Sequence, residues 1–154
     1  MTKAAPETRQ QFRHFRSIST RWMDNDVYGH VNNVVYYSFF DTAVNQYLIE
    51  EGGLEIDRSE TFGVVAESMC RFHRSLSFPE PIEAGVRVTR IGTSSVRYAI
   101  GIFRPGDPAA IADGHFVHVY VDRASRRPGP VPPRVRAALE RLLVPGEPAG
   151  PGGR

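Results

Sequence analysis

The stretch DNDVYGHVNNVVYYSFFDTA, residues 24–43, changes character halfway along. Its first half is a polar turn with two aspartates, a glycine and a histidine, and its second half is rich in aromatic residues. From Asn33 onward the apolar positions recur at helical spacing, at Tyr36, Phe39, Phe40, Ala43 and Tyr47. Asn32 or Asn33 can cap the start, and Gly52-Gly53 supplies a left-handed stop. The pattern predicts one long, largely buried helix of about 18 residues.

On either side of this helix, apolar and polar residues alternate as they do in β-strands. The expected strands lie in QFRHFRSISTRW (11–22), VVAESMCRFHRSLSF (64–78), IEAGVRVTRI (82–91), VRYAIGIF (96–103) and AAIADGHFVHVYVD (109–122). The fifth is apolar on both faces, which favours an interior position in the sheet. PVPPRVRAALERLL (130–143) predicts a short final helix, because proline is favoured in the first helical turn. The expected class is α+β, with an antiparallel sheet curled around one long helix.

The composition is that of one ordinary globular domain of 154 residues, 41% hydrophobic and 23% charged. A formal net charge of +2 is too balanced to predict nucleic-acid binding. A single cysteine, Cys70, excludes an intramolecular disulfide and fits a reducing cytoplasm. With no signal-peptide core and no stretch near the ~20 apolar residues of a membrane span, we expect a cytoplasmic protein. We expect a disordered arm at residues 1–10, a single domain at 11–143, and a disordered Pro/Gly-rich tail at 144–154.

The run from Asp24 to Phe40 resembles the signature of the 4-hydroxybenzoyl-CoA thioesterase-like group of hotdog proteins. In that group an Asp-x-Asp-x-x-Gly-(His)-Val-Asn-Asn motif leads straight into the central helix of a hotdog fold. The resemblance implies hydrolysis of an acyl-CoA or acyl-carrier-protein thioester. It also implies a homodimer or homotetramer with active sites at the dimer interface. Coenzyme A is then part of the substrate, and no separate cofactor is expected.

The same resemblance assigns the catalytic carboxylate to Asp26 and a carbonyl-polarising backbone N–H to Asn33. The chemistry suits these groups, because a helix start offers unpaired N–H groups and the positive end of the dipole. Asp26 would act as nucleophile or as general base. Gly29 allows the tight turn that aims both groups at one point, and His30 orders the loop or lines the pocket. Asp24 is expected to be structural.

The motif DNDVYG also mimics a calcium-binding loop, but Tyr28 and Val35 occupy positions where ligands belong, so we expect no metal site. The remaining candidate substrate contacts are weaker: Tyr36 for the acyl tunnel, Ser94 and Ser95 for pantetheine, and Arg71 with His73 for the CoA phosphates. Each has an ordinary alternative, as a core aromatic, a turn residue or a solvated basic edge.

Two histidines on the fifth expected strand, His115 and His118, lie three positions apart and therefore point to opposite faces. They cannot form a joint ligand pair, and we expect one of them to be buried. Two other functions also remain open. One is a non-catalytic acyl-CoA-binding or sensing protein on the same fold. The other is an enoyl-thioester hydratase, for which Asp26 and His30 lie closer in sequence than that chemistry needs.

Overall fold

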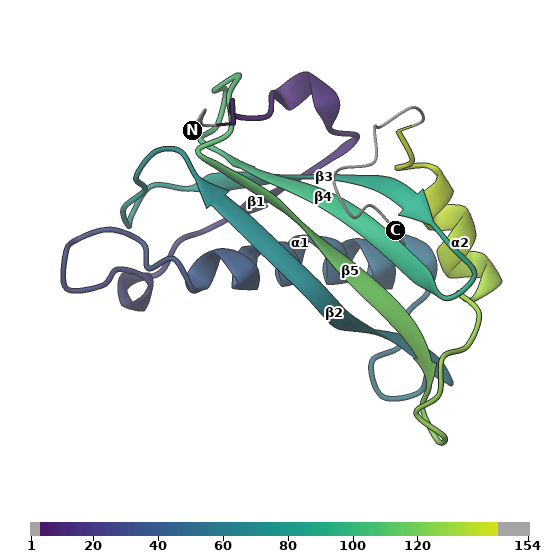
Figure 1. The fold of residues 1–154 in the computed structure, drawn as a ribbon. Helices are drawn as coiled ribbons and strands as arrows, with labels where there is room; N and C mark the ends of the chain where they lie inside the picture. Colours follow the sequence, from purple (N-terminus) through teal and green to yellow (C-terminus); the bar gives the residue numbers. More distant parts are fainter. Residues whose placement is uncertain (1–3, 145–154) are drawn as a thin grey trace.

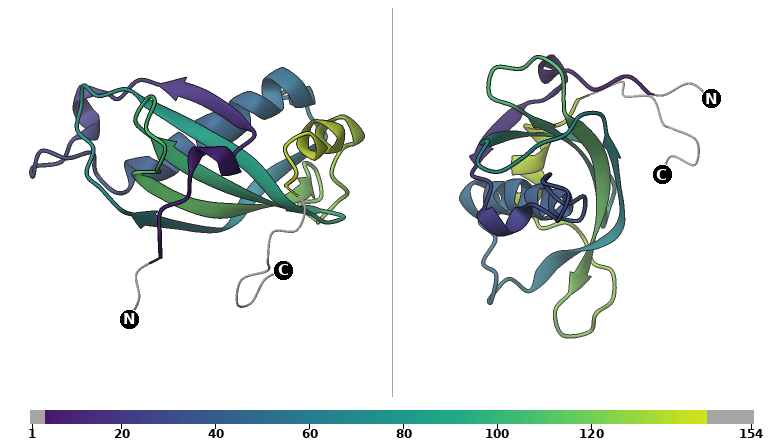
Figure 2. Two further views of the ribbon diagram at one scale, coloured as in Figure 1. Left: turned by 90° about the horizontal axis from the view of Figure 1, so that it is seen from above. Right: turned by 90° about the vertical axis from the view of Figure 1, so that its left-hand side faces the viewer.

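The computed structural model describes residues 4–144 and places the long helix against one curved sheet (Figure 1). Its elements in chain order are η1 (Arg9–Gln11), β1 (His14–Ile18), η2 (Trp22–Asp24), α1 (Val35–Gly52), β2 (Thr61–Phe72), β3 (Ile82–Ile91), β4 (Ser95–Phe103), β5 (Ala112–Asp122) and α2 (Pro133–Glu140). The five strands pair antiparallel in the order β1-β3-β4-β5-β2. Viewed nearly along α1, the sheet curves around the helix (Figure 2, right). This is the hotdog fold, and the predicted fold class is confirmed.

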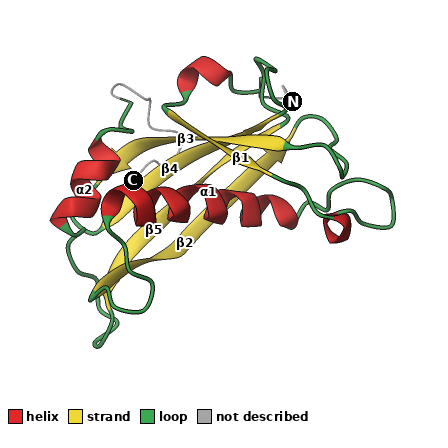
Figure 3. Ribbon diagram, turned by 180° about the vertical axis from the view of Figure 1, so that it is seen from behind, coloured by secondary structure: helices red, strands yellow, loops and turns green. Residues whose placement is uncertain are grey.

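Helix α1 forms where the sequence predicts it and ends at the predicted glycines. The N–H of Val34 donates to Asn32 Oδ1 at 3.2 Å, so the helix proper starts at Val35. At the other end Gly53 takes a φ of 70°, and the N–H of Leu54 donates to the carbonyl of Leu48 at 3.1 Å. These are the contacts of a left-handed C-terminal cap. The helix runs along the concave face of the sheet (Figure 3).

The main core lies between α1 and the concave face of the sheet. Four alternate residues of β4 are fully buried: Val96, Tyr98, Ile100 and Ile102. β5 lies between β4 and β2, so its predicted interior position is confirmed. Helix α2 packs against the end of α1, where the Tyr47 hydroxyl donates to the carbonyl of Ala138 at 2.6 Å. None of the helices within residues 4–144 is long and apolar enough to cross a membrane.

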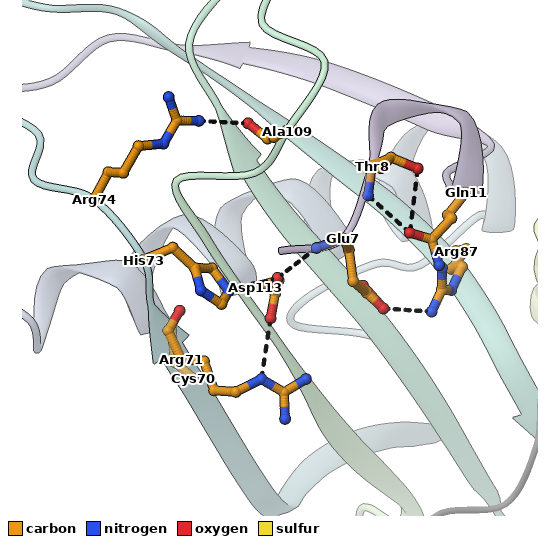
Figure 4. Close-up of polar contacts among 10 residues, drawn as sticks. All are labelled: Glu7, Thr8, Gln11, Cys70, Arg71, His73, Arg74, Arg87, Ala109 and Asp113. Atoms are coloured by element: carbon orange, nitrogen blue, oxygen red, sulfur yellow. Dashed lines mark hydrogen bonds and ion pairs between the residues drawn. The ribbon is translucent and has the colours of Figure 1, made fainter. Parts of the chain in front are cut away.

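The N-terminal segment covers part of the convex face of the sheet, so the predicted disordered arm is wrong for residues 7–10. Thr8 pairs with Ala109, and the N–H of Glu7 donates to the buried Asp113 carboxylate at 2.9 Å. Glu7 also accepts a hydrogen bond from Arg87 at 2.7 Å, and the Arg87 side chain is only 1% exposed (Figure 4). Residues 7 and 113 lie 106 positions apart in the chain, and local composition does not reveal such a contact.

The predicted disorder of residues 1–3 and 145–154 lies outside the described residues. Val144, which the sequence places in the tail, is attached to the sheet, since its N–H donates to the carbonyl of Val88 at 3.0 Å.

Candidate active site

Asp24 anchors the loop that precedes α1. Its side chain is 1% exposed, and its carboxylate accepts the backbone N–H of Arg21 at 2.7 Å and the Arg21 guanidinium at 2.8 Å. The carbonyl of Asp24 accepts the N–H of Asn32 at 2.9 Å. With both its side chain and its carbonyl engaged within the loop, Asp24 has the structural role that the sequence predicts.

Asp26 begins a tight turn that Gly29 makes possible. The N–H of Asp26 donates to the carbonyl of His30 at 2.9 Å, and the N–H of Gly29 donates back to the carbonyl of Asp26 at 3.1 Å. Gly29 has a φ of 84°, a conformation that favours glycine. Asp26 Oδ1 accepts the N–H of Tyr28 at 2.9 Å, while within residues 4–144 Oδ2 has no hydrogen-bond donor. The turn thus fixes one carboxylate oxygen and leaves the other available.

The backbone N–H of Asn33 has no acceptor in the part of the chain that the structure describes. Its neighbours are all engaged: the N–H of Asn32 donates to Asp24, and those of Val34 and Val35 donate to the side chain and carbonyl of Asn32. An unpaired N–H at the start of an 18-residue helix, reinforced by the positive end of the dipole, can polarise a carbonyl oxygen.

The loop folds back on itself, which keeps the Asp26 carboxylate and the Asn33 amide in one small region. Asn25 and Val31 form an antiparallel bridge, so residues 24–26 run beside residues 30–32. The loop is also tied to the segment after β2, because the N–H of Val31 donates to the carbonyl of Leu76 at 2.7 Å. The Ser77 hydroxyl donates to the carbonyl of Gly29 at 2.7 Å. The structure therefore collects Asp26, Gly29, His30 and Asn33 at the start of α1.

His30 and Tyr36 occupy different surroundings at this end of the helix. The His30 side chain is exposed, and its carbonyl closes the Asp26 turn. Tyr36 is only 3% exposed, with its ring 5.0 Å from that of Phe72, and burial raises the pKa of its hydroxyl to about 12. In this chain Tyr36 is a core residue behind the loop, and it does not line an open surface.

Arg71 and His73 converge on the buried carboxylate of Asp113, on the convex face of the sheet (Figure 4). Arg71 Nε lies 3.3 Å from Asp113 Oδ1, and His73 Nε2 lies 2.9 Å from Oδ2. The two side chains therefore share a side, as the strand pattern predicts. His73 is 4% exposed and thus largely committed to Asp113, whereas the Arg71 side chain is 47% exposed. Sequence reasoning missed Asp113, whose carboxylate also accepts the N–H of Glu7 in the N-terminal segment.

Ser94 and Ser95 do not lie with Asp26 in one chain. Ser94 lies in the turn between β3 and β4, and Ser95 is the first residue of β4. In this turn the carbonyl of Thr93 accepts the N–H of Val131, just before α2, at 2.9 Å. Because α2 packs at the far end of α1, the length of that helix, about 27 Å, separates this turn from the Asp26 loop. A single site that contains both serines and Asp26 of the same chain is therefore excluded.

Cys70 offers no nucleophile near this site. Its thiol is half-buried, and burial raises the pKa of the thiol to about 12, so the reactive thiolate is scarce at neutral pH.

The Asp26 loop carries an exposed apolar surface. Its large exposed side chains are Trp22, Met23, Val27, Tyr28 and Val34, each at least 65% exposed. The neighbouring strand β2 is an edge of the sheet, and its Val64 and Val65 side chains are 39% and 49% exposed. Unpaired strand edges and clustered exposed apolar side chains mark surfaces that associate with another chain.

A hotdog domain with a carboxylate turn at the start of its central helix has the architecture of a thioester-processing protein. The chain belongs to the thioesterase-like superfamily, whose family model matches residues 20–139.

The chain is also similar to known proteins. It is 51% identical to the PA5185 protein from Pseudomonas aeruginosa strain PAO1; the match covers 94% of this chain and 100% of that one, with a TM-score of 0.90. It is 27% identical over 120 residues to the uncharacterized protein YsmA of Bacillus subtilis, covering 77% of this chain and 80% of that protein. The BH1999 gentisyl-coenzyme A thioesterase shares the fold, with 22% identity, coverage of 82% and 99%, and a TM-score of 0.72.

Proposed function

We propose that this protein hydrolyses acyl-CoA thioesters, with Asp26 as the reacting carboxylate and the Asn33 N–H as the donor to the thioester carbonyl. The observation that carries the proposal is the unpaired Asn33 N–H at the start of α1, in the same small loop as Asp26. Membership of the thioesterase-like superfamily supports the reaction type.

In this proposal each group has its own step. The Asn33 N–H stabilises the negative charge that develops on the carbonyl oxygen, and one such donor contributes about 3 kcal/mol to transition-state stabilisation. The available Oδ2 of Asp26 either attacks the carbonyl carbon, forming an anhydride that water then opens, or takes a proton from the attacking water. In both routes the C–S bond breaks, and the CoA thiolate leaves and takes up a proton. The Tyr28 N–H, bonded to Oδ1, fixes the orientation of the carboxylate.

The proposed active unit is a homodimer, alone or as half of a homotetramer. Its interface forms where the β2 edges of two chains pair antiparallel, which continues the sheet across the interface and covers the exposed Val64 and Val65. The apolar loop around Asp26 lies beside this edge, because Tyr36 at the start of α1 contacts Phe72 at the end of β2. The active site then lies at the interface, where the partner subunit shields it from bulk water.

The acyl carrier in this proposal is coenzyme A. The BH1999 protein, which shares the fold, is a gentisyl-coenzyme A thioesterase. Arg71 provides an exposed guanidinium with only its Nε bound to Asp113, and a guanidinium fork suits the CoA phosphates.

The test is thiol release from a panel of short, long and aromatic acyl-CoAs, measured with a thiol-reactive dye. The wild type is expected to release thiol, and Asp26→Asn is expected to lose most of this activity while keeping its circular dichroism spectrum and melting temperature. Asp57→Asn, an exposed aspartate far along the chain, is the matched control and should keep full activity. Thiol release that does not depend on Asp26 would contradict the mechanism. Tight acyl-CoA binding in calorimetry without turnover would instead indicate an acyl-CoA-binding protein.

A further inference from the structure

A cavity of about 250 Å³ lies between the second half of α1 and the start of β2, away from the Asp26 loop of the same chain. Its walls are mostly apolar, with Leu48 from α1, Leu54 from the following loop and Phe62 from β2. The polar side chains in its lining are His118 and Tyr120 of β5, Asn45 of α1 and Arg123. The Arg123 guanidinium donates to the carbonyls of Ser59 and Ile56 at 2.7 and 2.8 Å. A cavity of about 150 Å³ is enough for benzene, so this one accepts a ring-sized group with several further atoms.

His118 is a buried polar group without a partner. Its side chain is 2% exposed, and within residues 4–144 neither ring nitrogen makes a hydrogen bond; Nδ1 is fully enclosed. The rings of Phe116 and Tyr98 lie 4.8 and 5.2 Å from the imidazole. Buried polar groups are almost always hydrogen-bonded, because an unpaired one costs about 1–3 kcal/mol. Because only Nδ1 is fully enclosed, Nε2 is the nitrogen that a ligand in the cavity can reach, and its lack of a partner points to a ligand that supplies one.

Gly63 makes room for this arrangement. A Cβ atom at Gly63 would lie 2.9 Å from His118 Nδ1, so a larger residue at this position would force the imidazole to move. Desolvation lowers the pKa of His118 to about 4, so the ring is neutral at neutral pH. A neutral imidazole offers one N–H and one lone pair, which suits a hydroxyl group and gives no attraction to a carboxylate.

We infer that this cavity is the acyl subsite of the proposed thioesterase, and that His118 selects acyl groups with a neutral hydroxyl at the end far from the thioester. The inference rests on the proposed function. His118 touches the end of the acyl group and not the reacting carbonyl, so it determines specificity and takes no part in bond breaking. Hydrocarbon acyl groups of the same size leave the imidazole unpaired and bind less well.

The cavity serves the Asp26 of the partner subunit. In its own chain the cavity begins at Asn45, which lies ten residues or about 15 Å along α1 from Val35. When two β2 edges pair antiparallel about a two-fold axis, the Gly63 end of one strand meets the Phe72 end of the other. The Phe72 end adjoins the start of α1, since the rings of Phe72 and Tyr36 are 5.0 Å apart. The site is therefore incomplete in a single chain.

The specificity is tested with pairs of substrates that differ only in a terminal hydroxyl: hexanoyl- and 6-hydroxyhexanoyl-CoA, and phenylacetyl- and 4-hydroxyphenylacetyl-CoA. In at least one pair the wild type is expected to prefer the hydroxylated member by about 10-fold or more in kcat/KM. His118→Leu and the ring-shaped His118→Phe should bring the ratio of the two kcat/KM values close to one. An equal preference in the wild type and in a folded His118 variant, or no preference in the wild type, would overturn the inference.

Binding to the Asp26→Asn protein separates this inference from the proposed function. Calorimetry with the same pairs should show the hydroxyl preference in Asp26→Asn and its loss in Asp26→Asn with His118→Leu. If that preference is found but the wild type turns over no acyl-CoA, the subsite stands and the proposed function fails. If the wild type turns over acyl-CoA with no effect of His118 on binding or rate, the function stands and the subsite fails.

A mixed dimer tests which Asp26 the cavity serves. Ile56 lines the cavity and is 73% exposed, so Ile56→Trp is expected to fill the cavity without disturbing the core. Ile49→Trp, on the exposed side of α1 and outside the cavity, is the matched control. Asp26→Asn and Ile56→Trp chains carrying different tags should each be inactive alone, and their purified mixed dimer should recover about half of the wild-type activity. No recovery would show that the cavity serves the Asp26 of its own chain.

Discussion

The buried imidazole of His118 predicts a specific loss of stability in mild acid. Desolvation lowers its pKa from 6.5 to about 4 in the folded protein, whereas in the unfolded chain the ring titrates near its ordinary value. As the pH falls below about 6.5, the unfolded state binds a proton that the folded state does not, so the free energy of unfolding decreases. The loss is absent above pH 7, reaches about 2 kcal/mol at pH 5, and levels off near 3 kcal/mol below pH 4.

The assay is urea denaturation of the wild type and His118→Phe at fixed protein concentration, at pH 7.5 and pH 5.0. Other titrating groups are the same in both proteins, so the difference between them isolates His118. His118→Phe should gain about 2 kcal/mol relative to the wild type on going from pH 7.5 to pH 5.0. Parallel pH profiles for the wild type and His118→Phe would refute the reasoning.

Three further predictions concern packing, the loop and the interface. Gly114→Ala should lower the free energy of unfolding, measured by urea denaturation, by at least about 2 kcal/mol, because the new Cβ would lie 1.9 Å from the carbonyl oxygen of Met69. Gly129→Ala, where the new Cβ has no neighbour closer than 4.0 Å, should change it little, and equal losses for the two variants would contradict this packing. Asp24→Asn should lower the free energy of unfolding by about 2 kcal/mol, because the buried side chain loses its charge-assisted hydrogen bonds to Arg21. An unchanged melting temperature would show that the fold of the loop does not depend on the Asp24 charge. Val65→Lys should shift the protein from dimer to monomer in analytical ultracentrifugation, because the substitution places a positive charge on each of the two facing β2 edges. An unchanged sedimentation coefficient would exclude the β2 interface.

The central helix and the sheet could be predicted from the sequence because their signals are local. The helical spacing of aromatic residues and the Gly52-Gly53 stop define α1, and alternation defines the strands. The burial of Arg87 could not be predicted from such local signals. Alternation places it on the polar face of β3, yet its side chain is 1% exposed, because the N-terminal segment folds over that face and Glu7 pairs with it. A contact between residues 80 positions apart leaves no trace in local composition.

The residues of the candidate site also fall into two groups, those that are close in sequence and those that only the fold brings together. Asp26, Gly29, His30 and Asn33 are close in sequence, so their grouping at the start of α1 follows from one motif. Ser94 and Ser95 lie at the other end of the helix in the same chain, which only the packing of α2 against α1 shows, and their contact with pantetheine stays a prediction. The sequence predicts that His115 and His118 face opposite ways. It does not show that Gly63 and a cavity lie beside His118, since these come from another strand.

The backbone N–H of Asn33 is the group on which the account depends most, and one pair of variants isolates it. Asn33→Pro removes the N–H just before the helix, where proline is tolerated, and Asn33→Ala removes only the side chain. With the best acyl-CoA of the panel, kcat for Asn33→Pro should fall by roughly 100- to 1,000-fold with the fold intact, while Asn33→Ala should stay within a few-fold of the wild type. Similar kcat values for a folded Asn33→Pro protein and Asn33→Ala would contradict the assignment of this amide as the oxyanion donor.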